Sequence, residues 1–86
     1  MKYIIISYSS RNSLYAFAKI LKQFGISSST INTPRNIAQS CGLSLKVDFY
    51  YLTQISNLVQ SSRLQGFWGV FLVTRTPTHE QIERII

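Results

Sequence analysis

Cys41 is the residue of this chain best suited to covalent chemistry, because a thiolate is a strong nucleophile. It lies near the middle of the 86 residues and is followed directly by Gly42, which permits a sharp turn. The basic residues nearest to it in the sequence are Arg35 before it and Lys46 after it. A nearby cation favours the thiolate over the thiol. Cys41 is therefore the candidate reactive residue, and Arg35, Gly42 and Lys46 are candidate binding residues around it.

The same cysteine can also be a small buried hydrophobe, which is a common role for a free cysteine. Pro34 and Gly42 bracket a stretch that we expect to form a short helix before the third strand. The sulfur would then lie at the C-terminal end of that helix, where the helix dipole disfavours a thiolate. Arg35 or Lys46 would have to approach the sulfur to offset this effect. The residues alone leave both roles of Cys41 open.

Other catalytic and metal-binding arrangements find little support. The chain has three carboxylates and one histidine, which is a poor basis for general acid–base catalysis. One cysteine and one histidine cannot complete a structural zinc site. No phosphate-binding glycine motif is present, and no cofactor is expected. A non-enzymatic protein is the expected class. Because a single cysteine cannot form an internal disulfide, a reducing, cytoplasmic location is expected.

The formal net charge of +6 favours an anionic partner, and nucleic acid is one such partner. The run 65–71, Gln-Gly-Phe-Trp-Gly-Val-Phe, is similar to RNA-recognition strands that pair glycine with aromatic residues. It departs from them because Trp68 occupies a position that should be small and because the run falls on the last expected strand. RNA binding, or a regulatory or interaction module without chemistry at Cys41, are the alternative functions. No apolar run approaches the ~18 residues of a membrane span, so no membrane partner is expected.

The apolar pattern predicts one α+β domain over residues 1–86. Strands are expected at 2–8, 27–32, 43–47 and 67–74, and helices at 11–24 and 49–63. The stripe of the first helix contains Leu14, Phe17, Ala18, Leu21 and Phe24. Thr78 and Gln81 resemble a capping box for a short C-terminal tail helix that would carry Ile82, Ile85 and Ile86.

This order of elements is that of a ferredoxin-like β-α-β-β-α-β domain. Two helices would cover one face of a four-stranded antiparallel sheet, with the first and last strands as its central pair. The opposite face would be solvated or used for self-association, with Tyr3, Trp68 or Phe71 on it. Because a monomer rarely leaves a large apolar patch bare, a homodimer through that face is expected as a hypothesis.

The central stretch also carries a family resemblance. Thr33-Pro34-Arg35 and Ser40-Cys41-Gly42-Leu43 together resemble the Pro-Arg…Cys-Gly signature of a small selenium/sulfur carrier-like family. Its members have about this length, and the resemblance extends over nearly the whole chain. It implies that Cys41 carries sulfur or selenium as a persulfide or selenosulfide, that Arg35 and Gly42 belong to the same site, and that donor and acceptor proteins are the partners. The carriers of tRNA thiolation have a Cys-Pro-x-Pro signature instead, and no proline follows Cys41 here.

Overall fold

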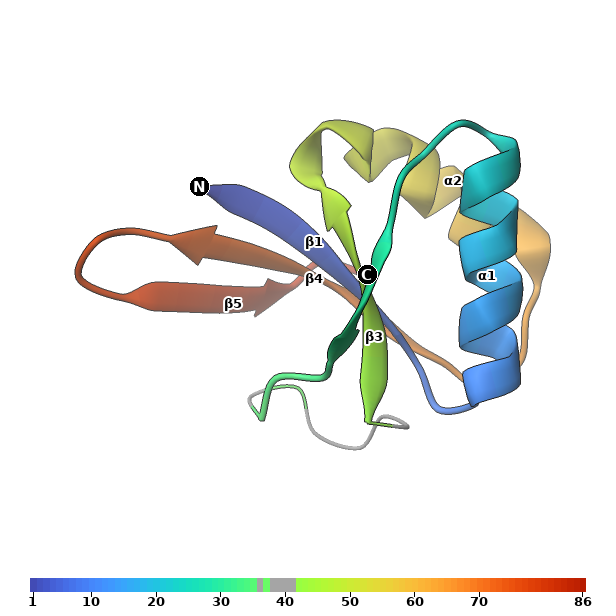
Figure 1. The fold of residues 1–86 in the computed structure, drawn as a ribbon, viewed down its shortest axis with the longest axis horizontal. Helices are drawn as coiled ribbons and strands as arrows, with labels where there is room; N and C mark the ends of the chain where they lie inside the picture. Colours follow the sequence, from blue (N-terminus) through green and yellow to red (C-terminus); the bar gives the residue numbers. More distant parts are fainter. Residues whose placement is uncertain (36, 38–41) are drawn as a thin grey trace.

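A computed structural model describes residues 1–35, 37 and 42–86 of the chain. The elements follow one another along the chain and are shown in Figure 1. They are β1 (Lys2–Tyr8), α1 (Arg11–Gln23), β2 (Ser29–Asn32), β3 (Leu43–Asp48), the 3-10 helix η1 (Phe49–Tyr51), α2 (Leu52–Ser62), β4 (Phe67–Arg75) and β5 (Glu80–Arg84).

The strands form one five-stranded sheet in the order β2-β3-β1-β4-β5, and every neighbouring pair is antiparallel. β1 lies at the centre because its apolar run can be buried on both faces, and its residues 4–8 are all buried. The expected pairing of the first strand with the strand at 67–74 is confirmed, since β1 lies beside β4. The sheet has one strand more than the four that were expected.

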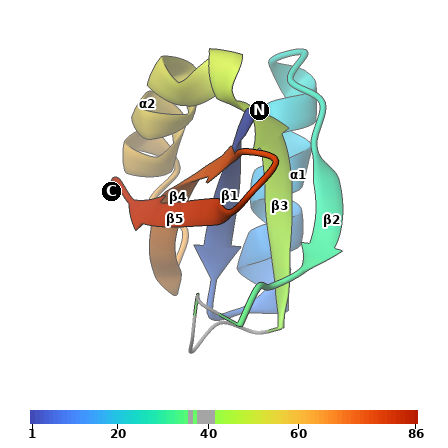
Figure 2. The same cartoon turned by 90° about the vertical axis from the view of Figure 1, so that its left-hand side faces the viewer.

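Both helices cover the same face of the sheet, as Figures 1 and 2 show. The helix-side core joins Ile4, Ile6 and Tyr8 of β1 to the stripe of α1 and to Ile55 of α2. Ser10 accepts a hydrogen bond from the Ser13 amide and begins α1 as its N-cap. In the stripe, Leu14, Phe17 and Leu21 are buried as predicted. Phe24 is 64% exposed, so its expected place in the stripe is wrong, because α1 ends at Gln23.

The opposite face of the sheet has a small core of its own, which we call the second-face cluster. Its buried members are Ile5, Ile37, Phe71 and Val73, and Tyr3, Ile31, Trp68 and Ile82 pack against them. Tyr3, Trp68 and Phe71 do lie on this face, as expected from the sequence. The face is not bare, however, since Ile37 from the β2–β3 connection and Ile82 from β5 help to cover it.

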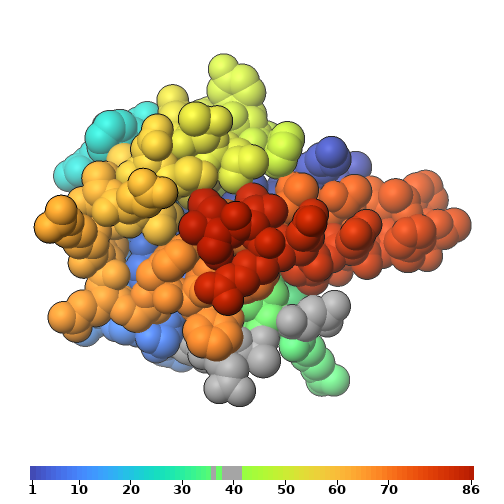
Figure 3. Space-filling view, turned by 180° about the vertical axis from the view of Figure 1, so that it is seen from behind, coloured from blue at the N-terminus to red at the C-terminus, as the bar shows by residue number. Residues whose placement is uncertain are grey.

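The C-terminal segment is a strand, and the expected tail helix is wrong. Thr76 closes a turn by exchanging backbone and side-chain hydrogen bonds with His79, and β5 then returns along β4. Ile82 pairs with Val73, so its side chain joins the second-face cluster. The β4–β5 hairpin extends away from the helices, which is clear in Figures 1 and 3.

The short helix expected between Pro34 and Gly42 lies for the most part outside the described residues. In the described part of the chain, no helix is long and apolar enough to span a membrane.

Candidate functional site

The connection between β2 and β3 is closed at its base by two backbone contacts. Asn32 pairs with Leu43 as the last pair of the ladder, and the Thr33 amide donates to the Gly42 carbonyl at 2.9 Å. Gly42 has a φ of 91°, which side chains other than glycine rarely adopt. The connection of residues 34–41 therefore begins and ends at two positions, Thr33 and Gly42, that are held together by this hydrogen bond.

Three hydroxyl groups reinforce this base from the second face. Ser44 Oγ lies 2.8 Å from Ser7 Oγ and 2.7 Å from Thr33 Oγ1. Ser7 and Ser44 are both fully buried, and they face each other across β1 and β3. The chain of hydrogen bonds links the entrance of the connection to the central strand. Because each buried hydroxyl finds a partner, the polar groups do not weaken the sheet.

The connection is also held by an apolar contact. The Ile37 amide donates to the Pro34 carbonyl at 2.9 Å, which forms a turn. Ile37 is only 3% exposed and packs in the second-face cluster with Ile5. A buried isoleucine contributes roughly 1.5–3 kcal/mol, so this side chain fixes where the connection meets the sheet.

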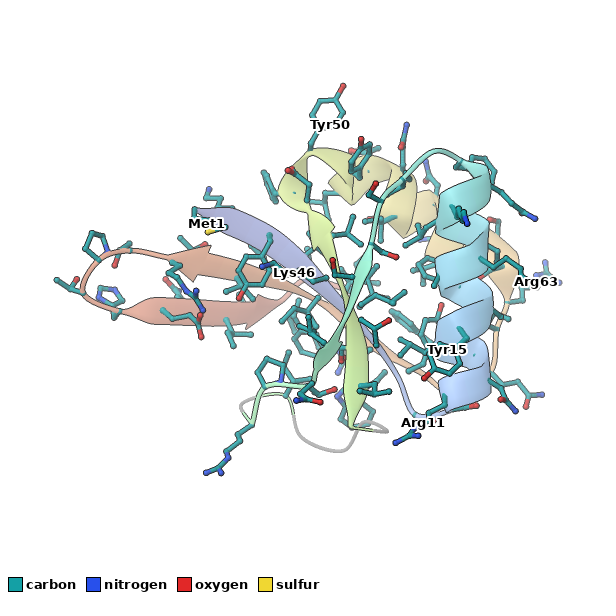
Figure 4. All side chains as sticks on the ribbon, viewed as in Figure 1. Met1, Arg11, Tyr15, Lys46, Tyr50 and Arg63 are labelled. Carbon is teal, nitrogen blue, oxygen red and sulfur yellow. The ribbon has the colours of Figure 1, made fainter. Side chains whose placement is uncertain are left out.

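The structure places the predicted site residues at different distances from this base. Cys41, the candidate reactive residue, lies outside the described residues. Arg35 is exposed just after Pro34, and Gly42 is exposed at the base itself. Lys46 lies further along β3, with its Nζ 4.4 Å from the centroid of the Tyr3 ring. Figure 4 shows Lys46 over the sheet.

The position of Lys46 separates it from the base of the connection. Four residues of strand span roughly 13 Å, which is the distance along β3 from Gly42 to Lys46. Lys46 pairs with Ile5 of β1. It lies two residues beyond Ser44 and therefore on the same face of the sheet. Its ammonium is held on an aromatic ring, which is a stabilising contact for a cation. Of the described candidates, Arg35 and Gly42 lie at the connection and Lys46 lies apart.

The hydroxyl groups of Ser7, Thr33 and Ser44 were missed by the sequence analysis. The available signal was the Leu43-Ser44-Leu45 alternation, which places Ser44 on the face opposite to the helices. Ser7 likewise interrupts the apolar run of β1. The alternation of apolar and polar residues is the same whether the serine hydroxyl is hydrogen-bonded to another side chain or exposed to solvent. It therefore indicates the face on which the serine lies but not its hydrogen-bond partner.

The aromatic run resembling an RNA-recognition strand is used for packing. Phe67 packs against the helix-side core, and Phe71 is only 8% exposed. The Arg84 guanidinium lies 5.9 Å from the Trp68 ring centroid, and its Nη2 donates to the Trp68 carbonyl at 2.7 Å. Gly69 is closely packed beside them, because a Cβ there would lie 3.0 Å from Arg84 Nε and 3.1 Å from the Phe71 ring. Stacking of bases requires exposed aromatic faces, which Phe67 and Phe71 do not offer.

No group of three or more His, Cys, Asp or Glu residues that could hold a metal ion occurs within residues 1–35, 37 and 42–86.

The chain matches a known protein family. The model of the family described as "Putative Se/S carrier protein-like" matches residues 2–67. The chain belongs to this family. The matched part of the Se/S carrier-like chain runs from β1 through α2 and ends at the first residue of β4. It includes Cys41 and the other three candidate residues, whereas the rest of β4 and all of β5 lie beyond it. No curated protein and no solved structure matches the chain.

Proposed function

We propose that this protein is a carrier that holds sulfur or selenium on Cys41 and passes it to a partner protein. Membership of the Se/S carrier-like family supports the proposal, because the only cysteine of the chain falls within the matched residues. A carrier of this kind needs a single thiol, since the acceptor supplies the second one. A persulfide carrier works where thiols stay reduced, so the proposal includes the cytoplasm as its location.

The proposed cycle has two thiol exchange steps and no net oxidation. The Cys41 thiolate attacks the outer sulfur of a donor persulfide, a new sulfur–sulfur bond forms on Cys41, and the donor leaves as a thiolate. An acceptor thiolate then attacks the outer sulfur of the Cys41 persulfide. The sulfur–sulfur bond on Cys41 breaks, the acceptor keeps the outer sulfur, and the Cys41 thiolate is released. With a selenosulfide, the outer atom is selenium.

Arg35, Gly42 and Lys46 have different proposed roles in this cycle. Arg35 is the exposed cation at the connection, and its charge would favour both the thiolate and the persulfide anion. Gly42 supplies the left-handed backbone next to the cysteine and closes the base with Thr33. Lys46, which is held on the Tyr3 ring, would contribute a weaker, more distant positive field.

The carrier proposal is tested by loading the purified protein with glutathione persulfide and recording intact mass. We expect a gain of one sulfur atom that is absent in Cys41→Ser and is removed by dithiothreitol. Arg35→Gln should lower the loading rate near neutral pH by about threefold, because a cation near a thiol favours the reactive thiolate. Lys46→Gln is the matched loss of charge further from the connection and should change the rate less.

Two results would count against the carrier. One is a wild-type protein that gains no sulfur while its thiol still reacts with iodoacetamide. The other is a thiol that labels slowly in the folded protein and quickly only after denaturation, as a buried structural cysteine would.

We also propose that residues 1–86 form one ferredoxin-like domain to which β5 adds a fifth strand. The order β2-β3-β1-β4, the antiparallel pairing and the two helices on one face support this arrangement. In it, β5 is an addition at the β4 edge. It extends the sheet at the edge opposite to β2.

A further inference from the structure

The two edges of the sheet differ in charge. β5 carries Glu80, Glu83 and Arg84 within five residues, and charges on an edge strand discourage pairing with other chains. β2, Ser29–Asn32, forms the other edge and contains no charged residue. Three of its four residues are exposed. The edge at β2 is therefore the one that remains open to an added strand.

A groove runs beside this open edge, between α1 and the segment that leads into β2. Its volume is about 580 Å³, and it is open to solvent. Figure 2 shows β2 at the margin of the sheet with α1 behind it. The apolar residues Ala18 and Ile26 contribute to its lining. The polar contributors include Lys19, Lys22, Ser28 and Thr30.

The groove has charge of one sign. The first 47 residues of the chain contain neither Asp nor Glu, so α1 and β2 supply no carboxylate. Lys19 and Lys22 are both exposed on the α1 side. Asp48, the first carboxylate in the sequence, caps η1 and accepts a hydrogen bond from the Tyr50 amide at 2.8 Å. A ligand in the groove meets two lysines from α1 and no acid from either wall.

We propose that β2 and this groove bind an extended acidic segment of a partner protein, which adds to the sheet as a further strand. Backbone hydrogen bonds to β2 would hold the segment. Because side chains of a strand alternate between its faces, every second side chain would point toward the groove. Thr30 of β2 lies on this same face of the sheet and lines the groove. Asp or Glu at those alternate positions complements Lys19 and Lys22.

β2 leads directly into Thr33, the residue at which the connection leaves the sheet. A segment paired with β2 would extend toward the connection that carries Cys41 in the sequence. The docking surface lies wholly in described residues of α1, β2 and the segment between them, and it does not depend on the chemistry proposed for the cysteine.

The probe is a short fluorescent peptide of alternating Glu and Val, titrated into the full-length protein at low salt. Nitrogen-15 NMR should show amide shifts centred on residues 28–32 and on the α1 lysines. Lys19→Gln and Lys22→Gln should each weaken binding about threefold. Arg11→Gln is the matched control, because it removes the same charge from the same helix about 12 Å away. Figure 4 shows Arg11 at the first turn of α1.

A second pair of probes separates strand addition from attraction of any anion. The same peptide with methylated backbone nitrogens keeps its charge but cannot complete the hydrogen bonds of an added strand, so its binding should be lost. An oligouridine probe should bind more weakly than the Glu-Val peptide. Absence of peptide binding, equal binding of the methylated peptide, equal weakening by Arg11→Gln, or tighter binding of oligouridine at the same residues would each overturn the proposal.

Discussion

Tyr8 has a buried hydroxyl with no hydrogen-bond partner in the described part of the chain. Its ring is well packed, with centroids 5.6 Å from those of Phe17 and Phe67. The nearby Ser62 hydroxyl donates instead to the Val59 carbonyl at 3.2 Å. Burial raises the pKa of Tyr8 above its ordinary value of 10.0, because the charged phenolate is disfavoured away from water. Burial of the unpaired Tyr8 hydroxyl is thus unfavourable for folding, whereas packing of the Tyr8 ring against Phe17 and Phe67 is favourable.

Tyr8→Phe should stabilise the protein by about 1 kcal/mol, because it removes the unpaired hydroxyl and keeps the ring. Below pH 10 the tyrosine is neutral in both states, and the difference should be constant. Above pH 10 the unfolded state loses the Tyr8 proton first, so it binds fewer protons than the folded state and the free energy of unfolding falls. Urea unfolding of both variants should therefore show a gap that widens at alkaline pH. A less stable Tyr8→Phe would mean that the hydroxyl has a partner.

The paired hydroxyls of Ser7 and Ser44 give the opposite prediction. Ser44→Ala leaves the buried Ser7 hydroxyl without a partner and should destabilise the protein by about 1–2 kcal/mol. Adding Ser7→Ala should then cost little or even restore stability, because both polar groups are gone. Chemical unfolding of the two single variants and the double variant measures this. Additive losses would show that the hydroxyls act separately, and Ser56→Ala on α2 is a control for loss of a hydroxyl alone.

At the scale of elements, α2 ends on an unfavourable residue. Arg63 follows Ser62 with a φ of 54°, in the left-handed region that glycine prefers. Figure 4 shows its side chain pointing away from the core. Arg63→Gly should therefore raise the free energy of unfolding by about 0.5–1 kcal/mol. Arg63→Ala removes the same charge but keeps the Cβ, and in thermal unfolding it should show no such gain. Equal effects of the two variants would assign the change to charge.

The elements also show what local sequence can predict. α1, β1, β3 and β4 were predicted to within about two residues because their apolar periodicity is strong. β5 was predicted as a helix because the spacing of Ile82 and Ile85 is compatible with one, whereas the pairing of Ile82 with Val73 depends on a turn at Thr76. A strand of five residues that is held by pairing with a distant part of the chain shows no recognisable periodicity in its own sequence.

The candidate site was predictable only in part, for a related physical reason. The cysteine, the neighbouring arginine and the positive φ at Gly42 are visible from residue types. The hydroxyl contacts of Ser44 and the burial of Ile37 depend on which strands become neighbours. The groove at β2 was missed because Lys19 and Lys22 are separated in sequence from the strand edge that they accompany.

At the scale of the whole molecule, the second face bears on the expected homodimer. Ile5 and Val73 are fully buried within one chain, and Phe71 is 8% exposed. A second copy on this face would bury only what remains exposed of four side chains that are already partly buried, Tyr3, Ile31, Trp68 and Ile82. We therefore expect a monomer at micromolar concentration in sedimentation velocity. A dimer that Trp68→Ala dissociates would contradict this and restore the expectation drawn from the sequence.

The bond from the Thr33 amide to the Gly42 carbonyl has a consequence for how this fold can vary. Because the bond and the neighbouring ladder fix both ends of residues 34–41, the length of that connection is uncoupled from the register of the sheet. Doubling a loop costs only about 0.6 kcal/mol in closure entropy. Connections of other lengths and sequences could therefore be accommodated without redesign of the strands beneath, provided that an apolar side chain takes the place of Ile37 on the second face.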